Sequence, residues 1–152
     1  IPAEIVERII AAQNYLAAYL NVRQLSFGLT DMAWHTITEP FEGDVEQFEV
    51  ASMAPSQVLP VVPGTAMAPA FGHIFSGGYA AGYYGYKWAE VLEADAFSLF
   101  KEKGIFNREV SGSFRENILS KGGTEHPMEL YVRFRGHKPE TKALIEKMGL
   151  GK

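Results

Sequence analysis

From Val50 to Tyr86 the sequence contains no Asp, Glu, Lys or Arg, a run of 37 residues. An uncharged stretch of this length could suggest a membrane-spanning helix, but four prolines and frequent glycines interrupt it: Pro55, Pro60, Pro63 and Pro69. We therefore expect a long uncharged loop, packed against protein or lining a cleft and followed by a helix. Loops of this length in compact domains tend to be functional.

The composition is that of an ordinary folded protein. The chain has 152 residues, of which 47% are hydrophobic and 21% charged, so we predict a single helical domain over residues 1–152. The net charge is −4 and no dense Lys/Arg cluster occurs, so we expect neither nucleic acid nor a membrane as a partner. The absence of cysteine excludes disulfide bonds and thiolate metal sites. The N-terminus lacks the features of a signal peptide, which favours a cytoplasmic location, with the periplasm as the alternative.

Helical periodicity accounts for the rest of the chain, and no alternation typical of strands is present. The fold class is therefore predicted to be all-α. Asp44 is a plausible N-cap, with Gln47 three residues later. Ser113 and Glu116 could start a shorter helix inside one of the expected ranges. The helices are expected from Pro2 to about Leu20, at 20–37, from Asp44 onward, from Gly77 or Gly78 to Lys103, and at 107–120, 127–135 and 139–148.

The segment GGYAAGYYGYKW, residues 77–88, contains four tyrosines. On a helix from Gly78, the side chains of Tyr79, Tyr83 and Tyr86 would share one face, while Trp88 would lie on another face and be buried. Each buried tyrosine hydroxyl needs a hydrogen-bond partner, so phenylalanine would be simpler in a core. The pattern favours a binding surface or a cleft, and a tyrosine-rich structural core is the alternative.

Three longer stretches resemble one enzyme family. FGHIFSGGYAAGYYGYKWAEVLEADAF, NVRQLSFGLTDMAWHT and GIFNREVSGSFRENILSKGGTEHPMELYVRFRGHKP are similar to the C-terminal part of the M3 family of zinc oligopeptidases, the group of thimet oligopeptidase, oligopeptidase A and bacterial peptidyl-dipeptidase. The resemblance covers nearly the whole chain and implies the helical C-terminal segment of a zincin-like peptidase. The family's H-E-x-x-H zinc motif is absent here, and His137 replaces the second arginine of a terminal Arg-Gly-Arg-x-Pro motif.

The resemblance implies roles for particular residues. By position in the family motif, Tyr86 would donate a hydrogen bond to the oxyanion, and His73 would be the second donor. Tyr79 and Tyr83 would contact the peptide, and the loop around Gly77 and Gly78 would adjust as the peptide binds. Both endopeptidase and peptidyl-dipeptidase action stay open.

Zinc would be the cofactor of the parent enzyme, but its ligands are missing from this sequence. We therefore expect the C-terminal part of a larger peptidase catalytic domain, inactive by itself. Its partners would be a short peptide substrate and the missing zinc-binding half of the same protein. The uncharged stretch would expose an apolar face and favour self-association. The alternative function is a non-catalytic helical module whose exposed tyrosines bind another protein.

Overall fold

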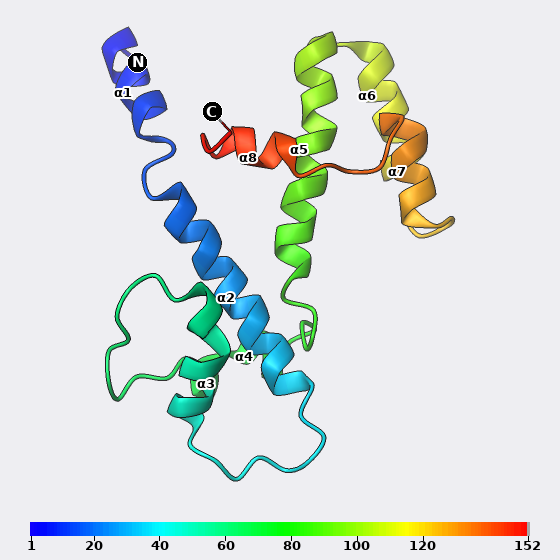
Figure 1. The fold of residues 1–152 in the computed structure, drawn as a ribbon. Helices are drawn as coiled ribbons and strands as arrows, with labels where there is room; N and C mark the ends of the chain where they lie inside the picture. Colours follow the sequence, from blue (N-terminus) through cyan, green and yellow to red (C-terminus); the bar gives the residue numbers. More distant parts are fainter. Residues whose placement is uncertain (152) are drawn as a thin grey trace. The chain divides into compact units, whose positions relative to one another are not determined.

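The computed structural model describes residues 1–151 and contains helices but no strand within that range, which confirms the all-α prediction (Figure 1). The chain divides into two compact units, Ile1–Lys87 and Trp88–Lys152, and the single domain expected from the sequence stays a prediction. The elements of the first unit are α1 (Ala3–Ala12), α2 (Ala17–His35), α3 (Val45–Met53), the short 3-10 helices Ala54–Ser56 and Ala68–Ala70, and α4 (Gly72–Phe75). Those that follow are α5 (Gly85–Lys103), α6 (Arg108–Phe114), a π turn (Arg115–Leu119), α7 (Pro127–Arg135) and α8 (Lys142–Lys147).

The first unit is organised around α2, which packs against α3. The hydroxyl oxygens of Thr30 on α2 and Ser52 on α3 lie 3.0 Å apart, and Trp34 of α2 packs on Phe48 of α3 with ring centroids 4.2 Å apart. Asp44 caps α3 as predicted, because its side chain accepts a hydrogen bond from the backbone N–H of Gln47. Helix α1, in contrast, buries none of its residues.

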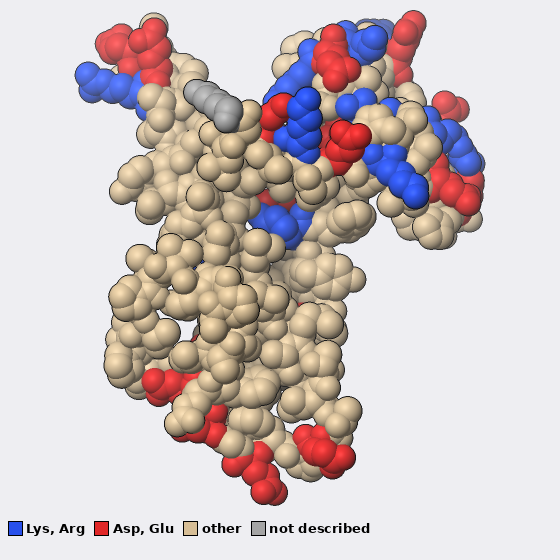
Figure 2. All heavy atoms as spheres, in the orientation of Figure 1, with Lys and Arg blue, Asp and Glu red and all other residues tan. Residues whose placement is uncertain are grey.

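Between α3 and α4 the uncharged stretch is largely irregular, apart from the two short 3-10 helices, and two glutamates of α3 hold it in place. The carboxylate of Glu46 accepts the backbone N–H of Gly64, and the buried carboxylate of Glu49 accepts those of Met67 and Ala68. Several apolar side chains of the stretch are exposed, among them Val58, Leu59, Val62 and Phe75. Figure 2 accordingly shows a broad uncharged surface over this unit. Within the described part of the chain, no helix is long and apolar enough to cross a membrane.

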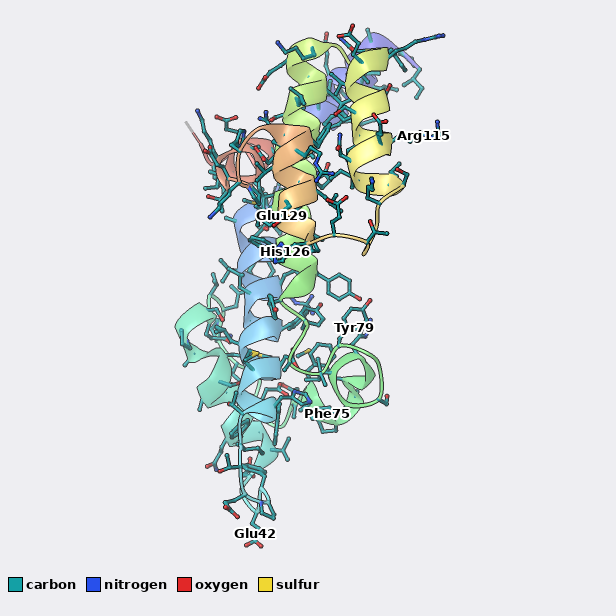
Figure 3. All side chains as sticks on the ribbon, turned by 90° about the vertical axis from the view of Figure 1, so that its right-hand side faces the viewer. Glu42, Phe75, Tyr79, Arg115, His126 and Glu129 are labelled. Atoms are coloured by element: carbon teal, nitrogen blue, oxygen red, sulfur yellow. The ribbon has the colours of Figure 1, made fainter. Side chains whose placement is uncertain are left out.

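The helix predicted to begin at Gly77 or Gly78 begins only at Gly85, so that prediction was wrong in its start. Residues 77–84 form turns instead, and Ala81 adopts a left-handed backbone with φ of 52°. Glycine is a poor helix former, and three glycines lie within residues 77–84. Figure 3 places Tyr79 on this irregular segment, after α4 with its Phe75.

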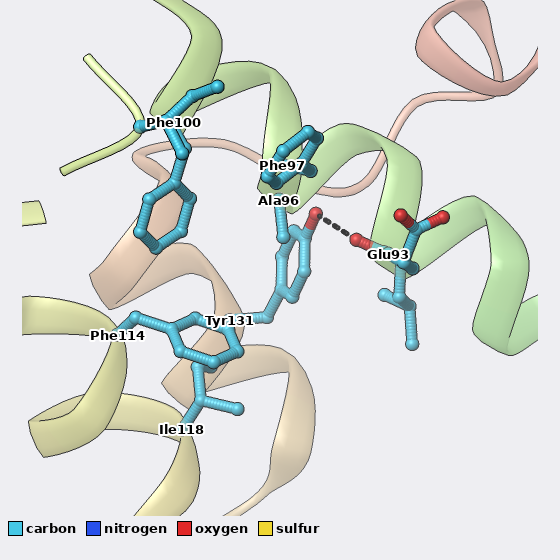
Figure 4. Close-up of a pocket in the computed structure, with 9 residues that line it drawn as sticks. Glu93, Ala96, Phe97, Phe100, Phe114, Ile118 and Tyr131 are labelled. Atoms are coloured by element: carbon cyan, nitrogen blue, oxygen red, sulfur yellow. Dashed lines mark hydrogen bonds between the residues drawn. The ribbon is translucent and has the colours of Figure 1, made fainter. Parts of the chain in front are cut away.

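In the second unit, α5, α6 and α7 surround an aromatic core. Tyr131 and Phe134 of α7 are buried together with Ala96 and Val110, and the Phe114 and Phe134 ring centroids lie 5.2 Å apart. Beside this core is a largely apolar cavity of about 500 Å³, lined by side chains that include Phe97, Phe100, Phe114 and Ile118 (Figure 4). The Tyr131 hydroxyl oxygen lies at its edge, 3.3 Å from the backbone carbonyl oxygen of Leu92.

The buried face of α5 differs from the predicted one. Trp88, which was expected in the core, is 49% exposed, whereas Asp95, which the sequence pattern placed on the polar face of the helix, is buried. Asp95 is buried because it has partners on α7: its carboxylate accepts the Tyr131 hydroxyl at 2.6 Å and lies 3.5 Å from the Arg135 guanidinium. A buried carboxylate is tolerated when it is paired and hydrogen-bonded in this way. Burial, followed by the hydrogen bond to Asp95, raises the pKa of Tyr131 above its ordinary range.

The helix expected from Pro2 to about Leu20 ends at Ala12, and α2 begins at Ala17 rather than at Leu20, so these bounds were wrong. Among the helix ends after α5, some follow local signals and others do not. Asn107 caps α6 by accepting the backbone N–H groups of Glu109 and Val110, and α7 has the predicted bounds. The alternative start near Ser113 was wrong, because α6 already contains that residue and the chain continues as a π turn. The last helix begins at Lys142 rather than at Pro139.

Candidate functional site

The four titratable side chains singled out from the sequence, those of His73, Tyr79, Tyr83 and Tyr86, meet in one cluster of rings. Tyr79 stacks on Tyr86 with centroids 4.9 Å apart, and Tyr83 lies 5.2 Å from Tyr86. His73 of α4 is 5.9 Å from Tyr79 and 6.5 Å from Tyr83. Tyr79 and Tyr86 are each 40% exposed, and His73 is also exposed. We call these four residues the His/Tyr cluster.

The side chains of Tyr79 and Tyr86 interact with each other. A hydrogen bond between the Tyr79 and Tyr86 side chains is the largest influence that raises the pKa of Tyr86 above its ordinary value of 10.0, and burial of part of the ring adds to it. A raised pKa keeps the hydroxyl proton on Tyr86 throughout the neutral pH range. The proton is lost only when the pH rises through this raised pKa. Tyr86 is therefore a neutral hydrogen-bond donor under physiological conditions.

This pairing makes a prediction for titration. Replacing Tyr79 with phenylalanine should lower the pKa of Tyr86 toward 10.0, because it removes the largest contribution to the shift. Titration of the tyrosine ring carbons by NMR measures the change, and Tyr84→Phe is the control, since Tyr84 is exposed on the same segment. An unchanged pKa for Tyr86 in Tyr79→Phe would show that the two hydroxyls do not interact.

Tyr83 is the anchored member of the His/Tyr cluster. Its hydroxyl donates to the side-chain oxygen of Gln24 on α2 at 2.9 Å, and its ring packs edge-on against Phe27 and Phe71, at 5.7 and 5.4 Å. Burial raises the pKa of Tyr83, against a lowering influence of the nearby Arg23. Because the hydroxyl proton is engaged with Gln24, the Tyr83 oxygen is left with acceptor capacity.

The backbone between the tyrosines is held by one buried carboxylate. Asp31 of α2 is fully buried, and its two oxygens accept the backbone N–H groups of Ala81 and Tyr83 at 2.9 and 2.8 Å. Nδ1 of His35, one turn later on α2, lies 2.8 Å from the same carboxylate. Gln24, Phe27, Asp31 and His35 follow one another at helical spacing, so a single face of α2 meets the segment.

The two glycines predicted to form the adjustable loop differ in their surroundings. A Cβ atom on Gly77 would lie 2.9 Å from the carbonyl oxygen of His73, so a side chain cannot be added there without a shift of the backbone. A Cβ atom on Gly78 would meet nothing within 4 Å. Gly77 is thus required for the close turn after α4, and its N–H donates to the carbonyl of Gly72 at 2.7 Å.

Sequence reasoning assigned no role to Asp31 or Gln24, although both lie in a stretch that carries the family resemblance. Their helical spacing from each other was the available signal, but it does not tell which segment they face. No three or more histidine, aspartate or glutamate side chains within residues 1–151 form a group that could hold a metal ion. The residues present therefore do not fit a zinc site.

The chemistry available in the His/Tyr cluster is hydrogen bonding. Tyr79 and Tyr86 present phenol groups to solvent, and the exposed imidazole of His73 can donate from one ring nitrogen. Such donors can bind carbonyl oxygens of an extended peptide, and a positioned donor stabilises a negative charge that develops on one of them.

Comparison with known proteins agrees with the family resemblance seen in the sequence. The sequence matches the family model described as "Peptidase family M3" over residues 1–150. It is 48% identical over 153 residues to oligopeptidase A of Escherichia coli, 38% identical over 155 residues to the probable cytosolic oligopeptidase A of Arabidopsis thaliana, and 38% identical over 151 residues to dipeptidyl carboxypeptidase of Escherichia coli. Each match covers 98–99% of this chain but only 22% of the relative.

Proposed function

Since this chain belongs to peptidase family M3, we propose that it is part of a longer metallopeptidase that hydrolyses short peptides. In this proposal the chain supplies the surface that binds the peptide and stabilises the transition state. The observation that carries it is the convergence of His73, Tyr79, Tyr83 and Tyr86 in one partly exposed cluster of hydrogen-bonding side chains. We refer to the protein of which this chain forms a part as the full-length enzyme.

Each member of the His/Tyr cluster has a role in the proposal. Tyr86 turns from Tyr79 toward the scissile carbonyl and donates to its oxygen as negative charge develops there, and His73 is the second donor. Tyr79 donates to a backbone carbonyl or to the C-terminal end of the peptide. The Tyr83 oxygen accepts a peptide N–H while its own proton remains on Gln24.

The remaining parts of the proposal concern the rest of the enzyme. Zinc, if it is the metal, is bound by residues outside this chain, and the chain by itself is inactive. Short peptides are the substrates, and the names of the relatives are compatible with both endopeptidase and peptidyl-dipeptidase action. We place the full-length enzyme in the cytoplasm.

A chimera tests the proposal. This chain replaces the matched 153-residue segment of Escherichia coli oligopeptidase A, and hydrolysis of a short peptide is measured. We expect an active chimera that loses its activity when Tyr79, Tyr83 and Tyr86 are all replaced by phenylalanine. The matched control replaces Tyr15, Tyr19 and Tyr84, which lie outside the His/Tyr cluster, and should stay active. If the two triple variants are equally active, the cluster has no part in hydrolysis.

A further inference from the structure

The backbone of the tyrosine segment donates two hydrogen bonds to a residue that has no assigned role, Asp31. Asp31 lies in the interior of α2 and has no exposed surface. Each of its carboxylate oxygens accepts one backbone N–H, that of Ala81 for Oδ1 and that of Tyr83 for Oδ2. Burying a carboxylate is costly unless it is paired and hydrogen-bonded. For Asp31, these two hydrogen bonds and the adjacent His35 offset the cost of burial.

The two hydrogen bonds determine the conformation of the segment. In a helix, the N–H groups of Ala81 and Tyr83 would donate to the carbonyl groups four residues earlier. Asp31 takes both donors, so the chain forms turns before Gly85 and Ala81 adopts φ of 52°. A residue with a side chain adopts this left-handed conformation only at a cost in free energy, which the contacts with Asp31 offset.

The conformation in turn brings the phenols together. The turn at Ala81 lies between Tyr79 and Tyr86 in the sequence, and it allows their rings to stack 4.9 Å apart. Both hydrogen bonds that Asp31 accepts from this segment come from backbone N–H groups, so its influence acts through the backbone. Gln24, two turns earlier on α2, accepts the hydrogen bond of the Tyr83 hydroxyl and is a second residue of α2 that holds this segment.

We propose that Asp31 is a positioning residue of the peptidase, whose buried carboxylate fixes the turn at Ala81 and thereby sets where the Tyr79 and Tyr86 hydroxyls meet the peptide. This inference rests on the proposed function. It assigns to Asp31 an effect on the chemical step that a residue important only for stability would not have. Misplacing a hydrogen-bond donor by about 1 Å can cost up to about 100-fold in rate.

The test uses variants of the full-length enzyme and measures kcat and KM separately. Asp31→Asn keeps the shape of the side chain but turns an NH₂ group toward a backbone N–H, and we expect kcat to fall by roughly 10- to 100-fold with a small change in KM. Adding Ala81→Gly should restore part of the lost kcat, because glycine adopts the left-handed conformation without help. The matched control is Glu49→Gln, which alters another buried carboxylate that accepts two backbone N–H groups. It should lower thermal stability and leave kcat unchanged.

Amide hydrogen exchange provides a readout that does not depend on activity. Asp31→Asn should remove protection at Ala81 and Tyr83 while the amides of α3 keep theirs. Unchanged protection at those two amides, or lost protection with an unchanged kcat, would overturn the proposal. If Asp31→Asn does not fold, Asp31→Glu serves instead: it keeps the charge but moves the carboxylate by one methylene. A parental kcat in that variant would likewise overturn the proposal.

The same measurements separate this inference from the proposed function. If Tyr86→Phe in the same enzyme leaves kcat unchanged, the catalytic role of the His/Tyr cluster fails. The exchange data then still report whether Asp31 holds the turn. If Tyr86→Phe lowers kcat and Asp31→Asn does not, the function stands and the positioning role of Asp31 is wrong.

Discussion

Replacing Tyr86 with phenylalanine in the full-length enzyme is expected to lower kcat by about 10²- to 10³-fold. This is the usual effect of removing one donor to a developing oxyanion, equivalent to about 2.7–4 kcal/mol. The ring is retained in the variant, so its stacking on Tyr79 is preserved and the fold should be maintained. Steady-state kinetics with a short peptide measure the effect.

Tyr84→Phe is the control for this change. Tyr84 is more exposed than Tyr86 and lies only two residues away, but it belongs to none of the ring pairs of the His/Tyr cluster. It should retain the parental kcat. An unchanged kcat in Tyr86→Phe would remove Tyr86 from the mechanism, and an equal loss in Tyr84→Phe would indicate a general disturbance of the segment.

The second large effect is expected on stability, in the second unit. Asp95→Ala should lower the free energy of unfolding by about 3–5 kcal/mol, because it removes the buried carboxylate beside the largely buried guanidinium of Arg135 and leaves only the exposed, more distant Glu102. Tyr131 loses its hydrogen-bond acceptor at the same time. Denaturant unfolding followed by circular dichroism measures this change.

An exposed ion pair on the same unit provides the comparison. Glu125 and Arg133 lie 2.6 Å apart at the surface, and Glu125→Ala should leave the unfolding midpoint nearly unchanged since exposed pairs contribute little. Equal losses in Asp95→Ala and Glu125→Ala would mean that the buried network between α5 and α7 has no special weight in stability.

Local signals in the sequence were enough to predict much of the helical structure. The bounds of α7 follow from Pro127 at its first turn and Gly136 after its end, where φ is 88°. Asp44 was recognisable as a cap because the bond it accepts lies only three residues away. In each case the residues that decide the boundary are neighbours in the sequence.

The failures have the opposite origin. The start of α5 could not be predicted, because Asp31, some 50 residues upstream, withdraws two backbone donors from the helix. The burial of Asp95 depends in the same way on Tyr131 and Arg135, which are 36 and 40 residues away. The candidate side chains were found from the sequence, but the helical face that was expected to unite them does not exist. A turn brings them together instead.

The role of Tyr86 in the transition state is tested by comparing the binding of a transition-state analogue with that of a substrate. A phosphinic peptide mimics the tetrahedral intermediate, whereas an uncleaved peptide of the same sequence mimics the ground state. Binding of both is measured for the parental full-length enzyme and for Tyr86→Phe. If Tyr86 stabilises the transition state, the analogue loses affinity in Tyr86→Phe by the same factor as kcat/KM, while the affinity of the uncleaved peptide stays unchanged. Equal losses for the two ligands would contradict it, because Tyr86 would then bind the substrate and the transition state alike.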